Sequence, residues 1–99
     1  MAMTMPISEF EAYYPEVISD LGQTFAAHEF VLALARRYEQ AYARALAAYV
    51  DYERPFQELN AILSAHLADF PGLVVETGER TITDLFGNLQ RVSVWRKVE

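Results

Sequence analysis

The fold is decided mainly by residues 24–52, TFAAHEFVLALARRYEQAYARALAAYVDY, in which large apolar side chains recur every three or four residues. This spacing places them on one face of a helix and leaves most charged side chains on the other face. The stretch therefore predicts a long amphipathic helix that buries a stripe of tyrosines against the rest of the domain. The members of this stripe are Val31, Leu34, Tyr38, Tyr42, Ala45, Tyr49 and Tyr52.

A shorter helix is expected before this stretch. Ser8 followed by Glu11 forms a capping box, with Ile7 in the staple position, and this pattern marks a helix start. Proline fits only the first turn of a helix, so Pro15 predicts either a kink or the start of a second short helix that stops before Gly22.

The long helix is expected to begin with Thr24 as its N-cap and to end near Glu53, because Pro55 disfavours helical geometry in the residue before it. Pro55 suits the first position of a third helix, where a backbone N–H would lack a partner in any case. Residues 55–70 carry apolar side chains at helical spacing, and Pro71 ends the helix.

After the third helix the chain becomes rich in residues that favour strands. We predict an antiparallel β-hairpin or a three-stranded meander at the C-terminus. A two-residue loop at Gly87-Asn88 would place Asp84 opposite Arg91 and Thr83 opposite Val92, and the opposite charges would support that register.

In this register both faces of the sheet carry apolar side chains, and one layer of helices covers only one face. Phe86, Leu89 and Trp95 are therefore expected to form an exposed apolar patch that a partner covers. Basic residues lie beside this patch and, with Trp95, suit single-stranded nucleic acid or an acidic partner. The favoured interpretation is that these charges protect an edge strand from aggregation, with Trp95 kept as a contact residue. The predicted partner-binding residues are Phe86, Leu89, Arg91, Trp95, Arg96 and Lys97.

The composition sets the class of protein. The 99 residues are expected to form a single domain, 1–99, and 53% of them are apolar. There is no cysteine, which excludes disulfides and thiolate metal sites. The N-terminus lacks the basic start and apolar stretch of a signal peptide, and no apolar segment is long enough to span a membrane. We expect a cytoplasmic protein that does not enter the membrane.

The expected fold class is α+β, with three helices, the first kinked and the second long, followed by the hairpin or meander. This order of elements resembles that of winged-helix domains, and the resemblance implies DNA binding by the third helix and the hairpin. However, residues 55–79 contain no Lys or Arg, and the net charge is −6. Because phosphate contacts supply most of the nonspecific affinity for DNA, duplex DNA is not the expected partner.

Neither catalysis nor a bound cofactor is indicated. His28 and His66 are the only histidines, and antiparallel packing of the second and third helices would bring them near each other. Two histidines with one carboxylate match no metal-binding motif, so we expect no metal site. Ser64, His66 and Asp69 lie on one helix at spacings that do not converge into a catalytic triad.

The function expected from the sequence is therefore a noncatalytic cytoplasmic interaction or regulatory module that binds a protein partner or a second copy of itself. The alternative is a winged-helix DNA-binding regulator that uses the C-terminal hairpin. A further alternative is an acidic inhibitor that mimics nucleic acid, with the charge supplied by residues 1–22, which contain four acids and no Lys or Arg.

Overall fold

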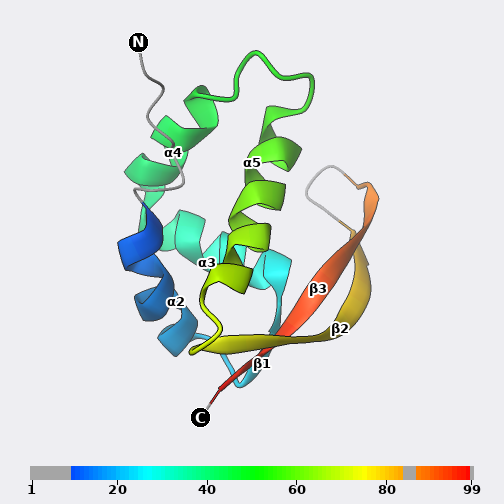
Figure 1. Ribbon diagram of the computed structural model, residues 1–99. Coiled ribbons are helices and arrows are strands. Elements are labelled where there is room, and N and C mark those ends of the chain that lie inside the picture. Colours follow the sequence, from blue (N-terminus) through cyan, green and yellow to red (C-terminus); the bar gives the residue numbers. More distant parts are fainter. Residues whose placement is uncertain (1–9, 84–86, 99) are drawn as a thin grey trace.

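The computed structural model describes residues 10–83 and 87–98 and shows an α+β fold, which confirms the predicted class (Figure 1). A layer of helices packs against a three-stranded antiparallel sheet, and the C-terminal hairpin forms most of that sheet. In chain order, the elements are η1 (Glu11–Tyr13), α2 (Tyr14–Asp20), β1 (Thr24–Ala26), α3 (Ala27–Arg37), α4 (Glu39–Ala47), α5 (Pro55–Ala65), η2 (His66–Asp69), β2 (Val74–Thr83) and β3 (Leu89–Lys97).

Pro55 starts a helix as predicted, and Pro15, which predicted either a kink or a new helix, lies in the first turn of one. Pro15 lies in the first turn of α2, which ends at Asp20, and Pro55 is the first residue of α5. At these positions proline has the required φ angle, and its missing N–H breaks no helical hydrogen bond. The predicted capping box at Ser8 lies outside the described residues.

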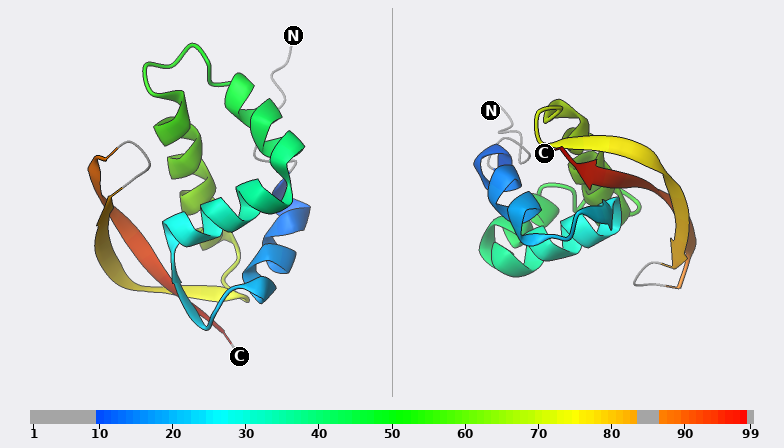
Figure 2. Two further views of the ribbon diagram at one scale, coloured as in Figure 1. Left: turned by 180° about the vertical axis from the view of Figure 1, so that it is seen from behind. Right: turned by 90° about the horizontal axis from the view of Figure 1, so that it is seen from below.

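The predicted long helix is divided into separate elements. Thr24 begins strand β1 instead of capping the helix, and α3 starts at Ala27. The backbone N–H of Ala26 donates a 2.8 Å hydrogen bond to Oε1 of Glu29, so a glutamate side chain satisfies the start of α3. A second interruption, at Tyr38, separates α3 from α4, and Figure 2 shows the two helices running in different directions.

Packing accounts for the break at Tyr38, where neither glycine nor proline is present. The ring of Tyr38 stacks on that of Tyr13, with 3.8 Å between ring centroids, and its hydroxyl donates to Glu16. The Tyr38 backbone leaves helical geometry (φ −127°, ψ 62°), yet its N–H still donates to Leu34 at 2.9 Å. The break thus loses little hydrogen bonding, and the contacts of Tyr38 hold the junction of α3 and α4 against η1 and α2.

The third strand of the sheet comes from the first third of the chain, between α2 and α3. The strand order is β1-β3-β2, so β1 pairs with β3, and Phe25 lies directly opposite Trp95. A three-residue strand has too few positions for its alternation to be recognised in the sequence.

The hairpin register differs from the prediction by three residues. Thr83 lies opposite Leu89 instead of Val92, and Val92 lies opposite Arg80. The two-residue loop was wrong because β2 ends at Thr83 and β3 begins at Leu89, which leaves five residues between the strands. Gly87, with φ of 83°, provides the positive φ that the turn signal predicted. Asp84 lies outside the described residues.

One hydrophobic core joins the helices to the first half of the hairpin. Its largest side chains come from every layer, and the fully buried ones include four aromatic rings and three leucines of α5 and η2. None of the helices within residues 10–83 and 87–98 has the length and apolarity needed to cross a membrane. The principal core residues are Phe10, Tyr14, Phe25, Phe30, Leu34, Leu59, Leu63, Leu67, Val74 and Trp95.

A β-bulge at Thr77 bends the hairpin. Glu76 lies opposite Trp95 and Gly78 opposite Val94, so Thr77 is the extra residue, and its hydroxyl donates to the Val94 carbonyl at 3.2 Å. A bulge increases local twist and turns the strand. Beyond it β2 is almost entirely exposed, so this half of the hairpin stands away from the helices (Figure 2).

Candidate functional site

The space between the bent hairpin and the helices is an open groove of about 820 Å³. Helices α3 and α5 form two of its walls, and the β2–β3 hairpin forms the third. A volume of this size lies within the range of natural ligand sites, about 300 to 1,000 Å³. We call it the α3/α5/hairpin groove.

Apart from Phe56 near its start, the α5 wall consists of small or amide side chains at helical spacing. Gln57, Asn60, Ala61, Ser64 and Ala65 recur at intervals of three and four residues, so they share one face of the helix. Ala61 and Ala65 are exposed although they are apolar. The α5 wall is therefore low and open, and it allows the backbone of a bound molecule to approach closely.

The α3 wall is more apolar. Val31 is buried at its base, whereas Leu32 is 38% exposed at the surface. Ala27 and Ala35 continue this face one turn to either side, and His28 adds the polar group. The α3 wall is thus an apolar strip that is buried at Val31 and exposed to solvent at Leu32.

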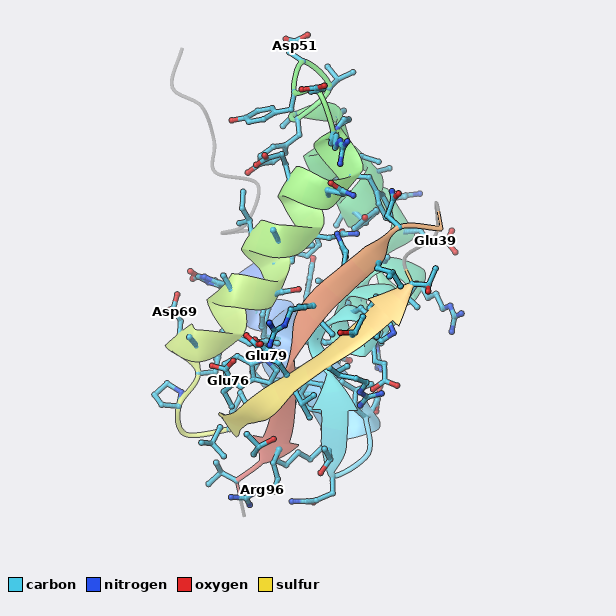
Figure 3. The ribbon with its side chains drawn as sticks, turned by 90° about the vertical axis from the view of Figure 1, so that its right-hand side faces the viewer. Glu39, Asp51, Asp69, Glu76, Glu79 and Arg96 are labelled. Atoms are coloured by element: carbon cyan, nitrogen blue, oxygen red, sulfur yellow. The ribbon has the colours of Figure 1, made fainter. Side chains whose placement is uncertain are left out.

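The hairpin wall carries the charged groups. Glu76 and Arg91 both line the groove, and Arg91 forms an ion pair with Glu79. Figure 3 shows Glu76 and Glu79 on β2, beside the C-terminal end of α5. Trp95 lies opposite Glu76 in the ladder, so the two side chains project from the same face of the sheet.

Two ring nitrogens in this groove lack hydrogen-bond partners. Among the residues that the structure describes, the buried side-chain atoms without a partner are Nδ1 of His28 and Nε1 of Trp95. Both residues line the groove. An unsatisfied buried donor costs about 1 to 3 kcal/mol, and natural proteins contain few of them.

Tyr42 connects α4 to the groove. Its half-buried ring lines the groove and meets the edge of Phe56, with 6.4 Å between centroids, and its hydroxyl donates to Oδ1 of Asn60 at 2.7 Å. Burial disfavours the phenolate and raises the pKa of Tyr42 to about 12 from its ordinary value of 10.

This shift predicts an alkaline loss of stability that depends on Tyr42. Because the folded state holds the phenol proton more tightly, the contribution of Tyr42 is complete below pH 10 and is lost as the pH rises toward 12. Tyr42→Phe should cost about 0.5 to 1.5 kcal/mol at pH 8, where the hydrogen bond is lost. In urea unfolding, the difference in free energy of unfolding between wild type and Tyr42→Phe should narrow from pH 10 to 12. A difference that stays constant over this range would contradict the shift.

The structure separates the predicted partner-binding residues. Leu89, Arg91 and Trp95 lie on one face of β3, whereas Arg96 lies on the other face. Lys97 donates from Nζ to the carbonyl of Ser19 at 3.2 Å and so ties β3 to the end of α2. Phe86 is outside the described residues.

The exposed apolar patch predicted from the sequence does not include Trp95. Trp95 is only 6% exposed and belongs to the core, whereas Leu89 is 76% exposed at the start of β3. The indole is buried because β1, absent from the predicted sheet, places Phe25 beside it. Trp95 is therefore a groove residue with a buried ring and not part of an exposed apolar surface.

The two histidines have different surroundings. His28 lines the groove, whereas His66 lies between two carboxylates, with Nε2 3.3 Å from Glu11 and Nδ1 2.8 Å from Asp69. The contact with Glu11 connects η1 to η2, the short helix that follows α5. Within the described part of the chain, no group of three His, Cys, Asp or Glu side chains is arranged to hold a metal ion.

Comparisons of this chain with models of protein families, with curated proteins and with solved structures each found no match. Function must therefore be argued from the groove itself. The winged-helix resemblance implied DNA contact by the third helix, but neither the α5 wall nor the α3 wall of the groove was predicted. Exposed apolar residues such as Leu32, which fall outside the tyrosine stripe, were the available signal.

Proposed function

We propose that this chain is a noncatalytic cytoplasmic interaction module that binds a short apolar segment of a protein partner in the α3/α5/hairpin groove. The observation that carries this proposal is the open, mainly apolar groove, whose wall includes a buried indole N–H without a partner. Segments of proteins bring apolar side chains, which match the mainly apolar lining of the groove.

The openness of the groove favours a protein segment over a small molecule. Small-molecule sites bury about 70 to 90% of their ligand, which requires walls on most sides. Here Ala61, Ala65 and Leu32 are all exposed along the rim. A chain that continues beyond the groove at both ends fits such a site better than an enclosed ligand does.

The charges favour a protein partner over nucleic acid. The α5 wall contains no Lys or Arg, and Arg91, the guanidinium of the hairpin wall, is already paired with Glu79. A surface that contacts phosphates needs available cations, and the net charge of −6 opposes such contacts further. The DNA-binding alternative therefore has little support from the groove.

A noncatalytic role is supported by the polar groups on the α3 and α5 walls. Ser64 and His28 are the nearest equivalents of a nucleophile and a base, and both line the groove. Nδ1 of His28 has no hydrogen-bond partner among the described residues, so this nitrogen activates no nucleophile there.

Selection from a library of random twelve-residue peptides displayed on phage tests the proposal. The wild-type domain is the target, and Ala61→Trp, which places a large ring in the groove, is the control target. We expect peptides with several apolar residues to be enriched on wild type and lost on Ala61→Trp. Failure to enrich any peptide that distinguishes the two targets would overturn the proposal.

A further inference from the structure

The charge within the groove identifies the chemistry of its occupant. Glu76 lines the groove and is exposed, and among the described residues its carboxylate makes no hydrogen bond or ion pair. The neighbouring Glu79 is occupied by Arg91, and Asp69 is occupied by His66. Glu76 is thus the groove carboxylate that remains available to a partner.

Trp95 lies beside Glu76 and provides a second argument about the occupant of the groove. It lies directly opposite Glu76 in the ladder, is nine-tenths buried, and carries the unpartnered Nε1–H. A carboxylate therefore stands beside a large apolar ring and an unused donor. Lys and Arg match the carboxylate and the apolar surface beside it, because their aliphatic stems lie along apolar surface while their charged heads reach an anion.

From this arrangement we infer that the segment bound in the groove carries a lysine or arginine whose cationic head pairs with the carboxylate of Glu76. The apolar side chains of the segment lie along α3 and α5. This inference rests on the proposed function and specifies its partner, since a neutral or acidic segment would leave Glu76 without a counter-charge. The acidity of the whole chain acts in the same direction, because it attracts basic partners.

A charge exchange between Glu76 and the selected peptides tests this inference. Peptides enriched on the wild-type domain should contain a lysine or arginine beside their apolar residues. Glu76→Gln should weaken their binding about 2- to 5-fold, as expected for an ion pair at an exposed position. Glu76→Lys should weaken it about tenfold or more, because two like charges then face each other.

Binding to Glu76→Lys should be recovered by a peptide whose basic residue is replaced by glutamate. Glu39→Gln is the matched control, since Glu39 is also exposed but lies at the start of α4, outside the groove (Figure 3). It should leave the affinity unchanged. Isothermal titration calorimetry at two salt concentrations gives the dissociation constants and the salt dependence of the pair.

The outcomes separate this inference from the proposed function. The inference would be overturned by peptides that do not bind Ala61→Trp but lack basic residues, or by peptides whose affinity is unchanged in Glu76→Gln. Either result would leave the groove as a protein-binding site. Absence of any groove-dependent peptide would overturn both. Sedimentation of the protein alone tests a second copy as occupant: a dimer that Ala61→Trp dissociates would overturn the assignment to another protein.

Discussion

Replacing Trp95 by Ala is expected to lower the free energy of unfolding by about 3 to 5 kcal/mol, the usual cost of removing a large buried ring. Trp95 is 6% exposed and lies opposite Phe25, so its removal opens a cavity where the sheet meets the helices. Small domains are stable by about 5 to 15 kcal/mol in total, and the variant should therefore be close to unfolding. Urea titration followed by circular dichroism measures this loss without the missing fluorophore.

Leu89→Ala is the matched control for Trp95→Ala. Both residues lie on β3 and point to the same face, but Leu89 is exposed and has no core to support. Its replacement should change the free energy of unfolding by no more than about 0.5 kcal/mol. Equal effects of the two substitutions would mean that Trp95 lies at the surface, and both the core and the groove as described would then be wrong.

Ala61→Trp is expected to reduce the affinity for groove-selected peptides about tenfold or more. Tenfold corresponds to about 1.4 kcal/mol, which is the scale of a single important contact in a protein interface. Ala61 is exposed on the α5 wall, so a tryptophan fits there without disturbing the core. The helix should lose at most about 0.7 kcal/mol from the lower propensity of tryptophan. Weak peptide binding with a melting temperature near that of wild type is thus the predicted combination.

If Ala61→Trp were destabilised, its loss of peptide binding would not distinguish a blocked groove from unfolding. Ala47→Trp therefore serves as a second control. Ala47 ends α4, is also exposed, and does not line the groove. Its substitution should leave peptide affinity unchanged. Loss of binding in both variants would show that the effect of the added ring is not specific to the groove.

Local signals in the sequence predicted most of the helical part of the fold. Pro15 and Pro55 begin helices because proline suits a first turn, and Gly87 adopts the positive φ that a turn requires. These effects depend on a few neighbouring residues. They are therefore visible in a single sequence.

The features that create the groove depend on residues far apart in the chain. The break at Tyr38 follows from its stacking on Tyr13, and the bulge at Thr77 follows from pairing with β3. Tyr38 carries no local signal such as proline or glycine. Thr77-Gly78 is a turn signal in the sequence, but the structure has a bulge within β2 at this position. The position of Trp95 likewise depends on β1, whose three residues precede α3. The α3/α5/hairpin groove could therefore not be predicted from periodicity.

The most direct test of the central claim is a ¹⁵N–¹H NMR titration of the wild-type domain with a selected peptide. The chain contains a single tryptophan, so one indole N–H signal reports on Trp95 alone. The account predicts that this signal shifts on binding, together with the backbone signals of Ala61 and Ala65. Shifts confined to another surface, such as that around the exposed Val50 and Tyr52, with the indole signal unchanged, would contradict it.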